Sequence, residues 1–233
     1  MKIALLGYGR MGKAIEEIAI VRGHTVVFKQ DKESFEGDLK KATIAINFST
    51  PDTAVMLIKK ALQLGIPVVS GTTGWQDEYD TITAFCKSQK SAFLYASNFS
   101  VGVNLFFKLN EMLASLMQQQ TEYTTKIEET HHIHKVDAPS GTAITLAEGI
   151  VKHTDYEAWS LTPENNKTLP IKAIREGEVP GLHRVDYESE FDSISILHNA
   201  NSRKGFALGA VIAGEWLEGK EGIFSMDDVL KLS

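Results

Sequence analysis

Residues 2–12 read KIALLGYGRMG, a short apolar run followed at once by a glycine pattern. The apolar run predicts a buried strand over residues 3–6, and a helical pattern behind the glycines continues to Ala19. Gly7 permits a tight turn, Gly9 lets the backbone approach a pyrophosphate, and Gly12 allows close helix packing. The alternative is an ordinary strand–helix turn. Because the glycines lie between a strand and a helix, the pattern predicts a dinucleotide-binding turn.

Four more short apolar runs follow, at residues 25–28, 43–48, 66–69 and 92–95. Helical patterns separate most of them, as in the segment after residue 50 that ends at Gly65. Strands that alternate with helices predict a parallel sheet covered on both faces, with apolar strands that do not alternate. We therefore expect an α/β fold of the Rossmann type, with a doubly wound parallel sheet.

The pattern changes after residue 98. Residues 100–117 predict one long buried helix, and residues 123–129 alternate as a half-exposed strand of an antiparallel or mixed sheet does. Further segments are predicted as strands near 185–187 and 194–196, a turn at 190–193, and helices at 206–217 and 226–230.

These segments predict two domains. Residues 1–98 and 205–233 are expected to form the dinucleotide-binding domain. An α+β domain for substrate binding and oligomerisation is expected to be inserted over residues 99–204. Residues 98–101 and 201–203 are the expected hinges.

Charge and composition exclude several classes of protein. A formal net charge of −6 over 233 residues argues against a nucleic-acid-binding surface, which is usually basic. A single cysteine, Cys86, excludes a disulfide within the chain. The N-terminal apolar run is short for a signal peptide, and no run reaches the roughly 18 residues of a membrane helix. We expect a cytoplasmic protein with neither a membrane nor a nucleic-acid partner.

The glycine loop and the end of the second predicted strand supply the first cofactor candidates. The loop candidates are Gly7, Tyr8, Gly9, Arg10, Met11 and Gly12. Asp31 is suited to the ribose hydroxyls, whereas Lys29 is suited to a 2′-phosphate, so the choice between NADH and NADPH stays open. Either residue could instead be a solvated loop charge.

Two later turns follow predicted strands, where ligands of open α/β sheets bind. Gly71, Thr72 and Thr73 follow the fourth strand, and Ser97, Asn98 and Phe99 follow the fifth. Small hydroxyl residues between glycines can offer backbone amides and hydroxyls to a cofactor. The alternative for the first turn is a simple helix N-cap.

Residues 129–142 read ETHHIHKVDAPSGT and form the densest cluster of titratable groups. Histidine exchanges protons near neutral pH, and lysine adds positive charge or a proton. A helix opening at Ser140 could bind a carboxylate through its free amides. We therefore expect a cationic loop beside a helix start, a receptor for a small dicarboxylate, although a solvated polar loop is the simpler alternative.

A metal site is the other alternative for this cluster. His131 and His134 are three residues apart, and Glu128 or Glu129 could complete a ligand set. No third ligand lies at a recognised helical spacing and the HExxH pattern is absent, so no metal is expected.

Residues 131–142, HHIHKVDAPSGT, closely resemble the signature of the 4-hydroxy-tetrahydrodipicolinate reductases, formerly dihydrodipicolinate reductases. The resemblance also covers the glycine loop, residues 71–73, 97–102 and 202–230, and so nearly the whole chain. Ile133 stands where many members carry Arg, which implies that this side chain is not essential. The glycine loop is one residue shorter than in many relatives, a departure that concerns cofactor contacts rather than the reaction.

The resemblance implies an NAD(P)H-dependent oxidoreductase of lysine and diaminopimelate biosynthesis. Its substrate would be a cyclic imine dicarboxylate and its product tetrahydrodipicolinate, formed by loss of water, hydride delivery and proton supply. By match to the signature, His131 is the acid–base residue, Lys135 a second proton donor and His132 a substrate contact, while a substrate carboxylate is held by Ser140, Gly141 and Thr142. The family further implies a homotetramer assembled through the inserted domain.

Two other functions remain open at this point. One is a non-catalytic NAD(P)-binding regulator of the same fold, which the His131 and Lys135 pair argues against. The other is a metal-dependent hydrolase, which the glycine loop argues against.

Overall fold

The computed structural model describes residues 1–32, 34–202 and 204–232. The chain divides into two compact units: Met1–Val101 with Lys204–Ser233, here called the first part, and Gly102–Arg203, the inserted part. Val101, rather than residue 98, is the last residue before the inserted part. Arg203, in the expected second hinge, lies outside the described residues.

The first part is built on a seven-stranded sheet with the order β12-β6-β5-β4-β1-β2-β3. Its strands are β1 (Lys2–Leu6), β2 (Thr25–Gln30), β3 (Phe35–Gly37), β4 (Ile44–Asn47), β5 (Val68–Ser70), β6 (Ala92–Tyr95) and β12 (Gly222–Phe224), and its α-helices are α1 (Arg10–Val21), α2 (Pro51–Gln63), α3 (Tyr79–Ser88), α6 (Lys204–Leu217) and α7 (Met226–Leu230). Neighbouring strands are parallel, except that β3 pairs antiparallel with β2. The predicted doubly wound sheet is thereby confirmed.

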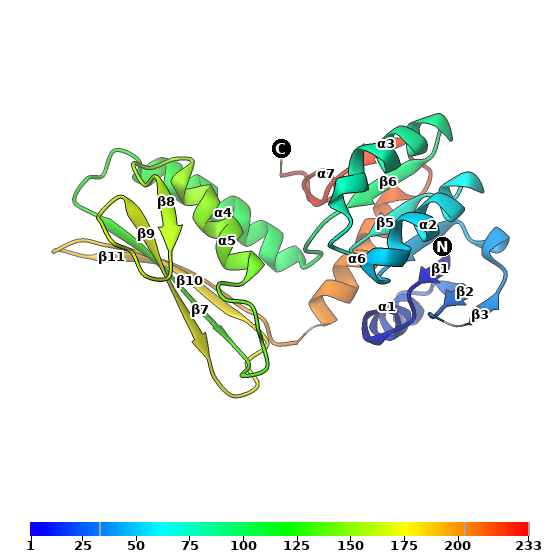
Figure 1. Cartoon of the computed structure of the whole chain (residues 1–233), viewed down its shortest axis with the longest axis horizontal. Coiled ribbons are helices and arrows are strands. Elements are labelled where there is room, and N and C mark those ends of the chain that lie inside the picture. The colour runs from blue at the N-terminus through cyan, green and yellow to red at the C-terminus, as the bar shows by residue number, and fades with distance from the viewer. Residues whose placement is uncertain (33, 203, 233) are drawn as a thin grey trace. The chain divides into compact units, whose positions relative to one another are not determined.

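Two layers of helices cover this sheet, as Figure 1 shows. Ile3 and Leu5 of β1 belong to the core formed with α1 and α6, whereas Ala4 and Leu6 belong to the core formed with α2 and α3. Because alternate residues of a strand point to opposite faces, a strand buried on both sides must be apolar throughout. The two edge strands β3 and β12 were not predicted, since each has three residues and, unlike β5, follows a polar segment rather than an apolar run.

The inserted part carries a five-stranded mixed sheet with the order β11-β10-β7-β9-β8. Its elements are α4 (Val101–Met117), β7 (Thr124–His131), α5 (Gly141–Val151), β8 (Ala158–Ser160), β9 (Thr168–Arg175), β10 (Leu182–Glu188) and β11 (Ser193–Asn199). β7 is antiparallel to β10 and parallel to β9. Residues of α4 and α5 share one core with β7, β9 and β10.

The predicted α+β insertion is confirmed, but β8 and β9 were missed. β9 contains Pro170, and proline within a run argues against a central strand. In the structure Pro170 pairs with Ser160 of the edge strand, and pairing with β7 begins only at Ile171. Among the described residues, no helix is both long and apolar enough to cross a membrane.

Candidate active site

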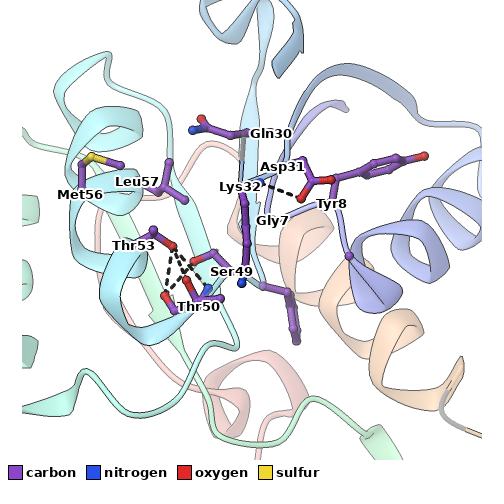
Figure 2. Close-up of a pocket in the computed structure, with 12 residues that line it drawn as sticks. Gly7, Tyr8, Gln30, Asp31, Lys32, Ser49, Thr50, Thr53, Met56 and Leu57 are labelled. Atoms are coloured by element: carbon purple, nitrogen blue, oxygen red, sulfur yellow. Dashed lines mark hydrogen bonds between the residues drawn. The ribbon is translucent and has the colours of Figure 1, made fainter. Parts of the chain in front are cut away.

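A pocket of about 240 Å³ lies at the carboxyl ends of β1, β2 and β4 (Figure 2). β1 lies between β2 and β4, so the strand order reverses at this point, and open α/β sheets bind ligands at such a reversal. The wall contains Gly7, Tyr8, Gly9, Gln30, Asp31, Lys32, Phe48, Ser49, Thr50, Thr53, Met56 and Leu57.

The three glycines of the loop have different surroundings. Gly7 has φ +103°, and a Cβ there would lie 2.2 Å from the carbonyl oxygen of Phe48. A Cβ at Gly12 would lie 2.3 Å from the carbonyl oxygen of Gly7, whereas one at Gly9 would meet nothing within 4 Å. Gly7 and Gly12 are thus required by the fold. Gly9, the N-cap of α1, leaves open space beside the helix amides, which fits a bound pyrophosphate.

The two candidates for the cofactor ribose lie in different environments. Asp31 lines the pocket and accepts a hydrogen bond from the amide of Lys32 (Figure 2). Lys29 is absent from the wall: its ammonium lies 2.5 Å from Glu16 and 4.8 Å from the ring centre of Tyr8. The hydrogen bond to Glu16 raises the pKa of Lys29. Lys32 is therefore the cation of the pocket wall, and the sequence interpretation overlooked it.

The turns after β5 and β6 pack around the turn after β4. The Thr72 hydroxyl accepts from the amide of Ser49 at 2.9 Å, and a Cβ at Gly71 would meet the ring of Phe48 at 2.3 Å. The rings of Phe48 and Phe99 are 5.6 Å apart. The pocket wall does not include the candidates Arg10, Met11, Gly12, Gly71, Thr72, Thr73, Ser97, Asn98 and Phe99. Their cofactor contacts stay predictions.

Residues 48–50 were also missed as pocket residues. Their position at and directly after the end of the strand predicted over residues 43–48 was the available signal, because that is where ligands of such sheets bind.

In the inserted part, the end of β7 carries a buried polar cluster. Thr125, Ile127, Glu129 and His131 are all buried, while the residues between them are more exposed. His131 was expected in a loop, but the alternation of β7 continues through it and makes it the last residue of the strand. Its Nδ1 lies 2.6 Å from Oε2 of Glu129, whose side chain is fully buried.

Glu129 joins three elements through its other carboxylate oxygen. Oε1 accepts from the amide of Ser140 at 3.1 Å and from Nη2 of Arg175 on β9 at 3.0 Å. Burial alone would raise the pKa of Glu129, but the contacts with His131, Ser140 and Arg175 outweigh it and hold the pKa at about 2. Glu129 is therefore a carboxylate at neutral pH.

His183 of β10 packs against His131, with ring centres 5.0 Å apart in an edge-on arrangement. Burial, followed by the proximity of His131, lowers the pKa of His183 to about 4, so this ring is neutral at pH 7. Its Nε2 lies 3.1 Å from the hydroxyl of Ser140. His183 and Arg175 were not singled out from the sequence, since each lies on a strand far from the signature.

The start of α5 contains the predicted carboxylate-binding residues. The Ser140 hydroxyl accepts from the amide of Ala143 and so caps the helix, and the Ser140 amide is held by Glu129. Gly141 and Thr142 occupy the first helical positions, whose amides have no partner within a helix. A Cβ at Gly141 would meet nothing within 4 Å, so there is room for an anion beside it. The geometry therefore favours the amides of Gly141 and Thr142, rather than the side chain of Ser140, as the groups that would bind a carboxylate.

The remaining signature residues follow β7. Lys135 donates to both carboxylate oxygens of Asp137, at 2.7 and 2.8 Å, which lowers the pKa of Asp137. His134 is exposed and lies 3.5 Å from Glu178. The rings of His132 and His134 are 6.1 Å apart. Ile133 is 60% exposed, in keeping with a dispensable side chain.

Among the described residues, the ligand atoms of Glu129, His131 and His183 approach one another within 4.8 Å, close enough to hold a metal ion. This is a different set from the one considered in the sequence, where Glu128 and His134 were candidates. Arg175 lies 3.0 Å from the same carboxylate, and a guanidinium so close opposes a bound cation. The absence of a metal stays a prediction.

Comparison with known proteins identifies the family. The family model described as dihydrodipicolinate reductase, N-terminus, matches residues 1–99, and the one described as dihydrodipicolinate reductase, C-terminus, matches residues 102–230. A 4-hydroxy-tetrahydrodipicolinate reductase of Christiangramia forsetii is 52% identical over 99% of this chain and 98% of its own length. One of Ralstonia nicotianae is 38% identical over 83% of this chain and 76% of its own.

A solved structure agrees in fold. Dipicolinate-bound dihydrodipicolinate reductase from Paenisporosarcina sp. TG-14 has a TM-score of 0.80 over 97% of both chains. At 20% identity, that likeness concerns the fold alone. The two family models together span nearly all of the chain, which therefore belongs to the dihydrodipicolinate reductase family.

Proposed function

We propose that this chain converts 4-hydroxy-tetrahydrodipicolinate, a cyclic imine dicarboxylate, to tetrahydrodipicolinate in lysine and diaminopimelate biosynthesis, with the 4-hydroxyl group leaving as water and the resulting conjugated ring being reduced. When bound, NADH or NADPH supplies the hydride. His131 supplies the proton that completes the reduction, and Lys135 is a second donor. The observation that carries this proposal is His131, a titratable ring held 2.6 Å from a buried carboxylate near a helix start suited to an anion.

The first part is suited to the cofactor. Gly9 leaves space at the N-terminus of α1 for a pyrophosphate. Asp31 in the pocket wall can accept from ribose hydroxyls, and Lys32 beside it can attract a 2′-phosphate. Because Lys29 is paired with Glu16, we assign it no direct cofactor contact.

The inserted part is suited to the dicarboxylate. The amides of Gly141 and Thr142 can hold one carboxylate. The ammonium of Lys135 pairs with the exposed Asp137, and we propose that it exchanges this carboxylate for one of the dianion. His132 is proposed to contact the substrate, as its place in the family signature implies. The hydroxyl of Ser140 caps α5 and contributes indirectly, by fixing the helix start.

The decisive experiment is a reductase assay with enzymatically prepared imine, comparing NADH with NADPH. Cofactor oxidation that depends on the imine is expected with at least one of the two. Tight cofactor binding without turnover of the imine would instead indicate a non-catalytic regulator.

We also propose a homotetramer and a cytoplasmic location. β11 is an edge strand whose Ile194 and Leu197 are 40% and 57% exposed, and assembly would cover such an edge. Cys86 is buried and unpaired, which suits a reducing compartment. Light scattering coupled to gel filtration tests the tetramer, and fractionation with immunodetection tests the location.

A further inference from the structure

We propose that Glu129 is a positioning residue for His131: its carboxylate holds the ring by Nδ1 and leaves Nε2 as the atom that exchanges the proton. The inference rests on the proposed acid–base role of His131 and extends it to a residue outside the signature's histidines and lysine.

The backbone of β7 brings the two side chains together. They are two residues apart on a strand, so both point to the same face. Oε2 of Glu129 and Nδ1 of His131 are 2.6 Å apart and form an ion pair, in which neither buried atom meets hydrogen-bond geometry or has another hydrogen-bond partner. Glu129 is 0% exposed and His131 is 8% exposed, so water competes little for this contact.

Charge determines which ring nitrogen carries the proton. Arg175 and the amide of Ser140 both donate to Glu129, so the carboxylate stays ionised and acts only as an acceptor. A neutral imidazole facing an acceptor must carry its proton on the facing nitrogen, here Nδ1. The same carboxylate stabilises the imidazolium that forms when Nε2 takes up a proton.

The surroundings keep Nε2 available. A Cβ at Gly181 would lie 3.1 Å from Nε2 of His131, so a side chain at this position would crowd the nitrogen. The neutral ring of His183 packs edge-on against His131 and hydrogen-bonds Ser140. His183 thus adds no second cation to compete for Glu129.

Glu129 could instead serve the fold alone, because it also ties the start of α5 to β9. If Glu129 is a positioning residue, it determines which nitrogen of the His131 ring carries the proton; if it serves the fold alone, it does not. Glutamine at position 129 keeps the size and can still accept from Ser140 and Arg175. Its amide group, however, donates toward Nδ1 and favours the tautomer with the proton on Nε2.

The tautomer is measured on the free enzyme by nitrogen-15 NMR with labelled histidine, at alkaline pH where imidazoles are neutral. A spectrum of His131→Gln identifies the His131 signals. The wild-type protein is expected to carry the proton on Nδ1, and Glu129→Gln on Nε2. A wild-type ring protonated on Nε2 would overturn the proposal without any variant having to fold.

Kinetics form the second arm. Glu129→Gln is expected to lower kcat roughly 10²-fold or more, because the comparable exchange behind the histidine of serine proteases lowers kcat about 10⁴-fold. KM and NAD(P)H affinity should change little. The matched control is Glu128→Gln, the same change on the opposite face of β7, where the carboxylate pairs with Lys172 at 2.9 Å. Near wild-type turnover is expected for this control.

The outcomes separate the two proposals. If Glu129→Gln loses turnover with an unchanged tautomer, Glu129 serves the fold and the positioning role is wrong. If the tautomer switches but His131→Ala turns over normally, the contact exists while the acid–base role of His131 is wrong.

Discussion

The candidate ligand sites in the two parts of this protein are built by opposite means. The first part uses backbone: glycines leave space, and the start of α1 offers amides at the reversal of strand order. The inserted part uses buried side chains, with Glu129, His131, His183 and Arg175 contributed by three strands. A site built from backbone amides should keep its function when a nearby side chain changes charge, but not when an added side chain fills the ligand space. A buried charged cluster should lose function after either kind of substitution. Substitutions should therefore have different consequences in the two parts.

The largest effect is expected in the buried cluster. His131→Ala should lower kcat by roughly 10²–10⁴-fold, the usual range for loss of a general acid–base group. KM should change less, because the lost interaction belongs mainly to the transition state. Lys135→Ala should also lower kcat, and it should raise KM if the ammonium attracts the dianion. Steady-state kinetics on the imine measure both effects.

The control for that prediction is His134→Ala, since His134 is exposed and lies 3.5 Å from the exposed Glu178. All three variants should keep full NAD(P)H affinity in a binding titration, because the proposed cofactor pocket lies in the other part. Near wild-type turnover of His131→Ala would make that histidine structural.

In the first part, volume should matter most. Gly9→Val places a side chain in the open space beside the start of α1, where an added Cβ meets nothing within 4 Å. Overpacking typically costs about 1–3 kcal/mol, which corresponds to roughly a 5- to 150-fold weaker NAD(P)H affinity. Fluorescence titration measures the affinity, and circular dichroism checks the fold.

Gly12→Ala is the matched contrast, because its Cβ would meet the Gly7 carbonyl oxygen at 2.3 Å. This variant should lose stability as well as affinity. A folded Gly9→Val protein with unchanged cofactor affinity would contradict the assignment of the pocket.

Acid should destabilise the inserted part through two groups. The pKa of His183 is lowered from 6.5 to about 4, so the unfolded chain takes up this proton first and stability falls as the pH drops through that window. The pKa of Glu129 is lowered from 4.5, its value in the unfolded chain, to about 2 in the folded protein. The ionised carboxylate therefore stabilises the fold fully above pH 4.5, and this stabilisation is lost as the pH falls from 4.5 to about 2. Each shift corresponds to about 3 kcal/mol at most.

Urea unfolding followed by NMR signals of β7 at a series of pH values measures this loss. His183→Asn should reduce the pH dependence of the unfolding free energy between pH 6.5 and about 4, whereas His134→Asn should not. An unfolding free energy that does not change with pH from 6.5 down to about 2 would show that His183 and Glu129 are not buried as described.

Metal removal is expected to have no effect on activity, the smallest change among these predictions. Arg175 already neutralises the carboxylate that a metal would need, so activity should survive treatment with a chelator. Assays before and after chelation, with and without added zinc, test this. Activity that is lost on chelation and restored by zinc would mean that Glu129, His131 and His183 hold a metal.

Local patterns in the sequence determined the doubly wound sheet, the glycine loop and the signature at residues 131–142. Each is contained in one continuous segment: a run of apolar residues, a turn between strand and helix, or a helix start. The alternation at residues 123–129 also pointed to β7, and its continuation to His131 would have placed Glu129 on the same face.

Tertiary structure decided what surrounds those segments. Arg175 and His183 reach Glu129 and His131 only because β9 and β10 pair on either side of β7, and strand pairing between distant segments leaves no local pattern. Lys29 and Lys32 are both cations near the carboxyl end of β2, yet of the two only Lys32 lines the pocket, because Lys29 forms an ion pair with Glu16 of α1. Sequence alone thus determined which chemical groups are present, while packing and charge pairing decided which of them face one another.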